Sequence, residues 1–172
     1  MVFSSAADLA ARIASSDLAV TADSVLILQN IGPVGHPGMP EAGLIPIPRK
    51  LAAQGVRDML RISDGRMSGT AGEATVVLHV SPEAAVVESP LGVVRDGDWV
   101  VLDVERRVLE AEAGEEEMAR RIEDRRRRVE EEETRKGGRP RRVRGYKGLY
   151  VKHVNQVEQG ADFDFFRADG GL

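Results

Sequence analysis

The chain has 172 residues and a mass of 18.7 kDa, enough for one domain with a hydrophobic core but too little for two domains of ordinary size. Its 24 Lys and Arg residues and 28 Asp and Glu residues give a formal net charge of -4, which argues against broad electrostatic affinity for nucleic acid. The chain has no cysteine, so its own side chains can form neither a disulfide nor a thiolate zinc site, and cannot ligate an iron-sulfur cluster.

The first segment, residues 1–19, is rich in Ala and Ser and contains Arg12, a composition found in organelle transit peptides. Two aspartates disagree with that interpretation, and Leu9 and Ile13 lie at helical spacing, so we favour an amphipathic helix. No apolar run approaches the ~20 residues that a membrane-spanning helix needs. We therefore expect a soluble, cytoplasmic protein without membrane contact, with the mitochondrial matrix as the alternative location.

Two expected strands follow, and each leads into a loop rich in glycine. Residues 24–28 form a short apolar run typical of a buried strand, and glycine and proline then preclude regular structure from 32 to 48. A helical turn over 49–53 and a second strand over 56–63 come next, before a second glycine-rich loop at 64–72. Loops on a rigid β scaffold often carry binding chemistry, so these two are the candidate site.

The following segment is expected to be rich in strands. Apolar runs at 75–80, 91–94 and 99–104 predict strands, with residues 96–98 as a tight hairpin turn, and a further strand over 106–112 would complete a meander. His79 is expected in the first of these strands as a hydrogen-bonded core residue.

The last third of the chain combines a charged helix with an apolar end. Residues 115–135 alternate Glu and Arg at a spacing that predicts a solvated helix. The basic run 135–144 fits either a flexible linker or a nucleic-acid-binding segment, and its composition favours the linker. A final helix is predicted over 146–159, with Leu149 in a stripe that faces the core and Gly160 as its cap. The aromatic residues of 163–166 are expected to anchor the end to the core.

Three side chains in the two glycine-rich loops are candidates for chemistry. Glu41 is held between Gly and Pro, which suits a metal ligand or a general base, although single surface glutamates are common. Ser68 and Thr70 have small neighbours that leave their hydroxyls free to face a ligand. The spacing around Ser68 departs from the nucleophile elbow of serine hydrolases. His36, His79 and His153 lack the spacing of a metal site.

Several motifs together resemble one family of enzymes. Residues 30–41 read NIGPVGHPGMPE, 63–70 read SDGRMSGT and 79–85 read HVSPEAA, with further agreement at 95–98 and from 145 to 165. These motifs resemble the carboxy-terminal domain of the dihydroxy-acid dehydratase and 6-phosphogluconate dehydratase family, and the closing segment is most similar to its sugar-acid dehydratase branch. The resemblance spans nearly the whole chain and thins over 110–144.

The resemblance implies a fold, a reaction and roles for the candidate residues. The implied fold is α/β, a compact β-barrel-like sheet flanked by helices, in a single domain over 1–172 with a charged helical or flexible insertion at about 110–144. Members of the family dehydrate 2,3-dihydroxy acids to 2-keto acids with an iron-sulfur cluster and a magnesium ion between two domains. By resemblance, Glu41 is a magnesium ligand, Ser68 removes the substrate's α-proton, and Thr70 positions substrate or returns a proton.

The family's amino-terminal domain supplies the cluster cysteines and most of the magnesium ligands. We therefore expect this chain alone to be catalytically inert, unable to bind the cluster by itself, and to need an amino-terminal dehydratase domain or a full-length homologous subunit, with a small hydroxy acid as substrate. The sequence departs from the family pattern at 85–90 and 70–75, which leaves a non-catalytic binding or interaction protein as the alternative. Nucleic-acid binding through the Arg-rich segment is a third hypothesis.

Overall fold

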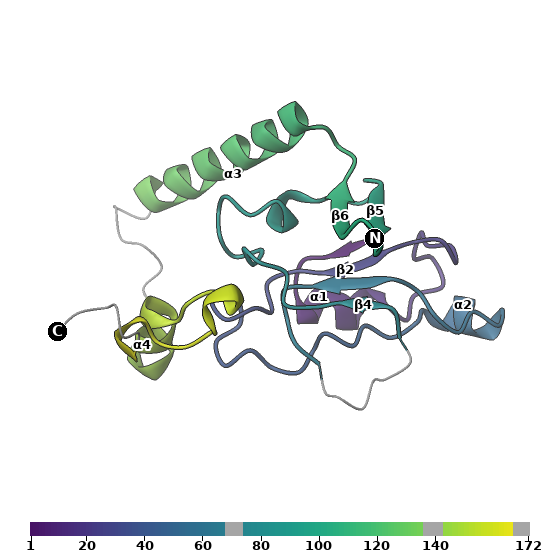
Figure 1. The fold of residues 1–172 in the computed structure, drawn as a ribbon, viewed down its shortest axis with the longest axis horizontal. Helices are drawn as coiled ribbons and strands as arrows, with labels where there is room; N and C mark the ends of the chain where they lie inside the picture. Colours follow the sequence, from purple (N-terminus) through teal and green to yellow (C-terminus); the bar gives the residue numbers. More distant parts are fainter. Residues whose placement is uncertain (68–73, 136–142, 167–172) are drawn as a thin grey trace.

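The protein has at its centre an open parallel sheet of four short strands (Figure 1). The structure is a computed structural model that describes residues 1–67, 74–135 and 143–166. The strand order is β1 (Val2–Phe3), β2 (Leu26–Leu28), β3 (Arg61–Ser63) and β4 (Val76–Val77). The middle strands β2 and β3 are buried along their whole length, as expected for parallel strands covered on both faces.

The two faces of the sheet have separate apolar clusters, because successive side chains of a strand point to opposite sides. Leu26 and Leu28 pack with Phe3 on one face, while Ile27 packs with Ile62 on the other. Helix α1 (Ala6–Arg12) covers the first face with its buried Leu9. The predicted 1–19 helix was thus too long, since its first residues form β1 and its last ones form turns.

The strand predicted over 91–94 is wrong. Its residues form the 3₁₀ helix η1 (Leu91–Val93), in which Leu91 and Val93 are buried. The Gly92 backbone lies against the backbone of Ala84, so closely that a Cβ added at Gly92 would lie 2.6 Å from the Ala84 carbonyl oxygen. This close approach accompanies the turn. The turn predicted at 96–98 therefore does not join two strands. The strands predicted over 99–104 and 106–112 are confirmed, since β5 (Val100–Asp103) pairs antiparallel with β6 (Val108–Ala111).

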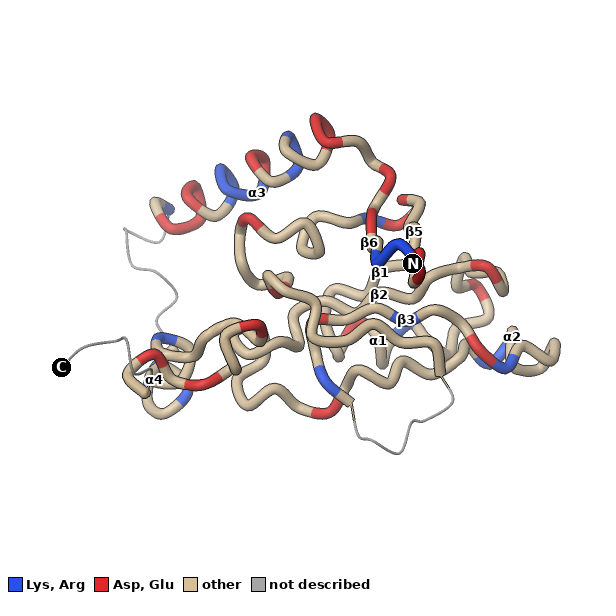
Figure 2. The backbone as a smooth tube through the Cα atoms, viewed as in Figure 1, with Lys and Arg blue, Asp and Glu red and all other residues tan. Residues whose placement is uncertain are grey.

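The two helices predicted over 49–53 and 115–135 are confirmed. Helix α2 (Arg49–Ala53) is followed by Gly55 at φ +90°, and α3 (Glu115–Arg135) has the predicted bounds. Figure 2 shows blue and red alternating along α3, which packs on η1. Its anchor is Arg121, which is 8% exposed and forms a two-pronged pair with Asp98 at 2.6 and 3.0 Å.

The final helix is shorter and more exposed than predicted. Helix α4 (Gly145–His153) ends before two 3₁₀ helices, η2 (Val157–Gln159) and η3 (Asp164–Phe166), and Gly160 ends η2 rather than α4. The chain turns back at residue 154, where Val154 forms a bridge with Phe163. Leu149 is 51% exposed and Phe166 is 67% exposed, so neither the predicted stripe nor the predicted anchor faces the core.

The α/β class is confirmed, with a small antiparallel sheet beside the parallel one. The described residues leave β1 and β4 as open edges of the parallel sheet, so they do not show the predicted barrel-like closure. Within the same residues, no helix is both long enough and apolar enough to cross a membrane.

Candidate functional site

The two glycine-rich loops leave the sheet next to each other. Strands β2 and β3 are parallel neighbours, with Leu28 opposite Ser63, so the loops that follow them begin at the same edge of the sheet. In open parallel sheets, this edge at the carboxyl ends of the strands is where ligands bind. The loops stay together farther out, because Glu41 and Arg66 form a parallel backbone bridge.

Arg66 joins the two loops through its backbone and its side chain. Its Nε donates to the Met39 carbonyl at 2.6 Å, and its Nη1 lies 3.1 Å from the Glu41 carboxylate. Its carbonyl oxygen accepts from the Gly43 amide at 2.7 Å, an approach so close that a Cβ at Gly43 would lie 2.9 Å from that oxygen. The Glu41 side chain keeps 47% of its surface exposed, so its carboxylate remains open to solvent and to a ligand.

Asp64, at the end of β3, holds the start of the first loop from inside. Its side chain is fully buried and accepts from the amides of Asn30 and Ile31, each at 3.0 Å, and of Ala84 at 2.8 Å. Burial raises the pKa of Asp64 above its ordinary value of 3.8, and the negative charge of Glu83 adds to that effect, while the three amides oppose it.

Glu83 holds the next part of the same loop. Only 1% of it is exposed, and its carboxylate accepts from the amides of Val34 at 2.9 Å and Gly35 at 2.7 Å. Gln156 both donates to this carboxylate, at 2.7 Å, and accepts from the Glu83 amide, at 2.8 Å. A Cβ at Gly32 would lie 2.7 Å from Glu83 Oε2, so this carboxylate lies against the loop backbone.

We call Asp64 and Glu83 the carboxylate clamp, because together they receive four amides of residues 30–35. Sequence reasoning did not single out either residue. Both occur inside the motifs quoted above, but no local pattern marks them as buried. The clamp positions the loop that carries Glu41 and does not face solvent.

The predicted site residues are only partly placed. Glu41 lies on the outer part of the first loop beside Arg66, while Ser68 and Thr70 lie outside the residues that the structure describes. Arg66 precedes Ser68 by two positions in the chain. The prediction for His79 is wrong: it follows β4, has a φ of +55° and is exposed.

The described residues can be tested for their fit to a metal ion. No group of three or more His, Asp or Glu side chains among them could hold a metal ion. Glu41 provides one exposed carboxylate, the type of ligand that Mg²⁺ takes from proteins in ones and twos. It therefore fits a magnesium site whose other ligands come from elsewhere.

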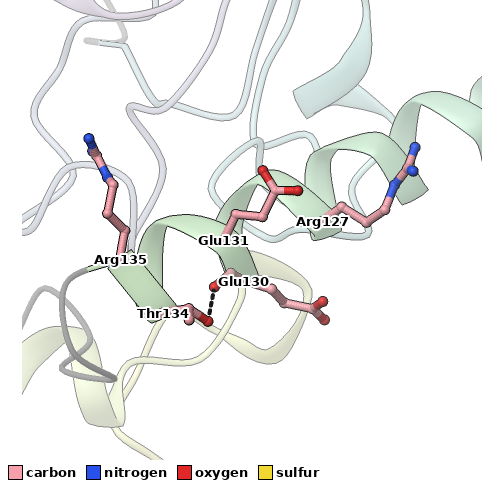
Figure 3. A pocket seen from close by; sticks show the side chains of 5 residues that line it. All are labelled: Arg127, Glu130, Glu131, Thr134 and Arg135. Atoms are coloured by element: carbon pink, nitrogen blue, oxygen red, sulfur yellow. Dashed lines mark hydrogen bonds between the residues drawn. The ribbon is translucent and has the colours of Figure 1, made fainter.

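A shallow hollow along α3 is a different feature. Figure 3 shows that its lining side chains all come from the last turns of this one helix: Arg127, Glu130, Glu131, Thr134 and Arg135. Thr134 donates to the Glu130 carbonyl at 2.9 Å, within the helix itself. The hollow is a space between long charged side chains, and we do not assign it to the site.

Comparisons with known proteins identify the family. The family model described as dihydroxy-acid/6-phosphogluconate dehydratase, C-terminal, matches residues 1–161. The chain is 48% identical over 171 residues to the 6-deoxy-6-sulfo-D-gluconate dehydratase of Pseudomonas putida, covering 98% of this chain and 27% of that protein. It is 44% identical to the L-arabonate dehydratase of Azospirillum brasilense, covering 96% of this chain and 27% of that protein.

A more distant relative is the dihydroxy-acid dehydratase of Pyrobaculum aerophilum, 35% identical over 159 residues, which cover 92% of this chain and 25% of that protein. The chain thus spans about a quarter of the length of these curated relatives.

Proposed function

This chain belongs to the dihydroxy-acid/6-phosphogluconate dehydratase family as its carboxy-terminal domain, and from that premise we propose that it forms one half of the active site of a hydro-lyase. The reaction would convert a 2,3-dihydroxy acid to a 2-keto acid. A sugar acid is the favoured substrate, because the relatives with 48% and 44% identity are sugar-acid dehydratases by name. A branched-chain dihydroxy acid is the second possibility.

The observation that carries this proposal is the pairing of the two glycine-rich loops through Arg66. The loop that bears Glu41 is bridged to the chain two residues before Ser68, as a site built from both loops requires. The carboxylate clamp fixes the first loop from within, so Glu41 projects from a supported backbone. Pre-organisation of this kind is what electrostatic catalysis needs.

In this proposal Glu41 binds Mg²⁺ together with carboxylates of an amino-terminal domain. Bound there, the ion would stabilise the negative charge that develops on the substrate carboxylate as the α-proton leaves. Ser68 would act as an alkoxide that takes this proton and becomes a neutral hydroxyl, and Thr70 would orient the substrate or return a proton. The cysteine ligands of an iron-sulfur cluster would also come from the amino-terminal domain, since this chain has none.

The alternative of a non-catalytic binding protein rested on two altered segments, 70–75 and 85–90, and residues 70–73 lie outside the part of the chain that the structure describes. Residues 85–90 form two consecutive turns, in which the amides of Val86 and Ser89 donate to the carbonyls of Glu83 and Val86. The buried Ser89 hydroxyl donates to the Pro82 carbonyl at 2.6 Å. The adjacent clamp contact between Ala84 and Asp64 is kept, so these substitutions do not argue for loss of the site.

Two finer expectations belong to the same proposal. Barrel-like closure of the sheet is proposed for the assembled two-domain protein. A cytoplasmic location is proposed because cluster cysteines of the partner domain would stay reduced there, with the mitochondrial matrix as the alternative.

The test is dehydration of a sugar acid by the 172-residue chain, alone and with the amino-terminal region of the Pseudomonas putida relative. The chain alone should be inactive, and the mixture active. Ser68→Ala and Glu41→Gln should each lower the turnover of the mixture by about 100-fold or more, as for loss of one major electrostatic or proton-transfer group. Glu88→Gln, at an exposed site, is the matched control. Turnover by the chain alone, or a mixture unaffected by Ser68→Ala, would contradict the proposal.

A further inference from the structure

The segment 143–166 contributes nothing to the hydrophobic core. Neither apolar cluster of the sheet contains any of its residues, and α4 has no buried residue. The ribbon shows α4 at one end of the molecule, beside the sheet rather than over it (Figure 1). Its attachments to the rest of the chain include the Gln156–Glu83 hydrogen bonds and a hydrogen bond from Ser81 to Glu158.

This segment nevertheless gathers aromatic side chains on one surface. Four α4 residues occur at helical spacing and so share one face of that helix: Tyr146, Leu149, Tyr150 and His153. The face continues into the tail, where Tyr150 contacts Phe163 at 5.8 Å between ring centroids and His153 contacts Phe165 at 5.5 Å.

We call this surface the aromatic face, and it includes Phe163, Phe165 and Phe166 together with the four α4 residues. Its rings pack mainly on one another. The ring centroid of Phe165 lies 5.2 Å from that of Phe163 and 4.7 Å from that of Phe166. Tyr146 is 92% exposed, Phe166 67% and Phe165 54%. Exposed aromatic side chains gathered in this way mark an interaction site in soluble proteins, because water contact with them is unfavourable.

We propose that the aromatic face is the surface on which the family's amino-terminal domain docks. Three observations select this occupant. The chain spans only about a quarter of its relatives, and the matching family model is a carboxy-terminal one, so a large preceding region exists in those proteins. The family model ends at residue 161, but the match to the Pseudomonas putida relative covers 98% of this chain, so that relative shares nearly all of this segment as well.

The third observation is the connection to the candidate site. Gln156, in the same segment, is hydrogen-bonded to Glu83, which in turn holds the amides of Val34 and Gly35. The segment that bears the aromatic face is therefore attached to the loop that carries Glu41, as suits a domain that docks there and also completes the shared active site. This third argument rests on the proposed function, because it assumes an active site shared by the two domains.

Binding between the 172-residue chain and the amino-terminal region of the Pseudomonas putida relative tests the proposal, measured by isothermal titration calorimetry. The variant Phe165→Ala/Phe166→Ala should weaken binding by about 100-fold, because central aromatic side chains of an interface each contribute about tenfold or more. Trp99→Ala is the matched control, because Trp99 is also a highly exposed aromatic residue, at 77%, but it precedes β5 and is not part of the aromatic face. This control should change binding by less than about twofold. Both variants should retain the wild-type melting temperature, since the replaced rings are exposed.

Four results would overturn the inference: no binding by the wild-type chain, wild-type binding by the double variant, an equal loss in Trp99→Ala, or self-association of the chain that the double variant abolishes while domain binding persists. The last result would assign the face to a second copy. The activity assay separates this inference from the proposed function. If the domains bind through the aromatic face without turnover, the proposed function is refuted and the proposed docking surface is supported. If turnover occurs and the double variant binds as tightly as the wild type, the docking surface is refuted and the function is supported.

Discussion

Replacement of Glu83 by alanine would remove the acceptor that holds the first glycine-rich loop. Three donors lose their partner in this variant: the amides of Val34 and Gly35 and the side-chain amide of Gln156. Glu83 is 1% exposed, so water does not replace the lost contacts without local opening of the structure.

The expected cost follows from these contacts. A hydrogen bond to a charged group contributes about 1.5–3 kcal/mol, and the loss is offset in part because alanine removes the burial of a carboxylate. We therefore expect Glu83→Ala to lower the free energy of unfolding by about 3–5 kcal/mol. For a domain of this size, about 2–4 °C of melting temperature corresponds to each kcal/mol, so the melting temperature should fall by roughly 6–20 °C.

Thermal unfolding at neutral pH, followed by circular dichroism, measures this shift. Glu88→Ala is the control, because Glu88 has 60% of its side chain exposed and pairs with Arg126 only at 3.4 Å. Such a surface pair contributes less than about 1 kcal/mol. Amide hydrogen exchange should accelerate at Val34 and Gly35 in the Glu83 variant alone. If the two variants melt together, or if these amides keep their protection, the clamp does not hold the loop.

Two further predictions concern the attachment of α3. Arg121→Ala should lower the free energy of unfolding by about 3 kcal/mol in urea titrations, because it leaves the Asp98 carboxylate, 11% exposed, without its cation; an effect no larger than that of Glu88→Ala would contradict this. The hydrogen bonds from Arg121 lower the pKa of Asp98 below its ordinary value of 3.8, so the stability from this pair is complete above pH 3.8 and is lost as pH falls through the lower folded value. Unfolding measured from neutral to strongly acidic pH should show a smaller acid-induced loss in Asp98→Asn than in the wild type, and equal losses would refute the assignment.

The elements predicted correctly are those whose local signal agrees with their surroundings. The charge pattern of α3 is typical only of a solvated helix, and the apolar run of β2 is typical of a buried strand, and both predictions are confirmed. The apolar run at 91–94 suits a strand as well, but the close approach of Gly92 to Ala84 holds it as a turn. Long-range contacts of this kind are not visible in a local pattern.

In the candidate site too, local patterns and long-range contacts differ in what can be predicted from sequence. Glu41 was one of many candidate glutamates on local pattern alone and was given a magnesium role only by resemblance; the structure places it on an exposed loop beside Arg66, and its role stays a prediction. Asp64 and Glu83 were not predicted, because one sequence does not tell a buried carboxylate from the exposed ones that make up most of this charged chain. The aromatic tail was expected in the core for the general reason that exposed rings are unfavourable, which takes no account of a second domain.

The inward orientation of the loop amides has a bearing on how an acidic substrate is recognised. Glycine-rich loops of nucleotide-binding proteins direct their N–H groups outward and so wrap an anion. Here the amides of Asn30, Ile31, Val34 and Gly35 already face internal carboxylates, and an incoming anion would meet none of these four donors. This turn supports the loop from inside and does not wrap an anion, so in the proposed enzyme the charge of a hydroxy acid would be met by cationic groups or by donors from other parts of the protein.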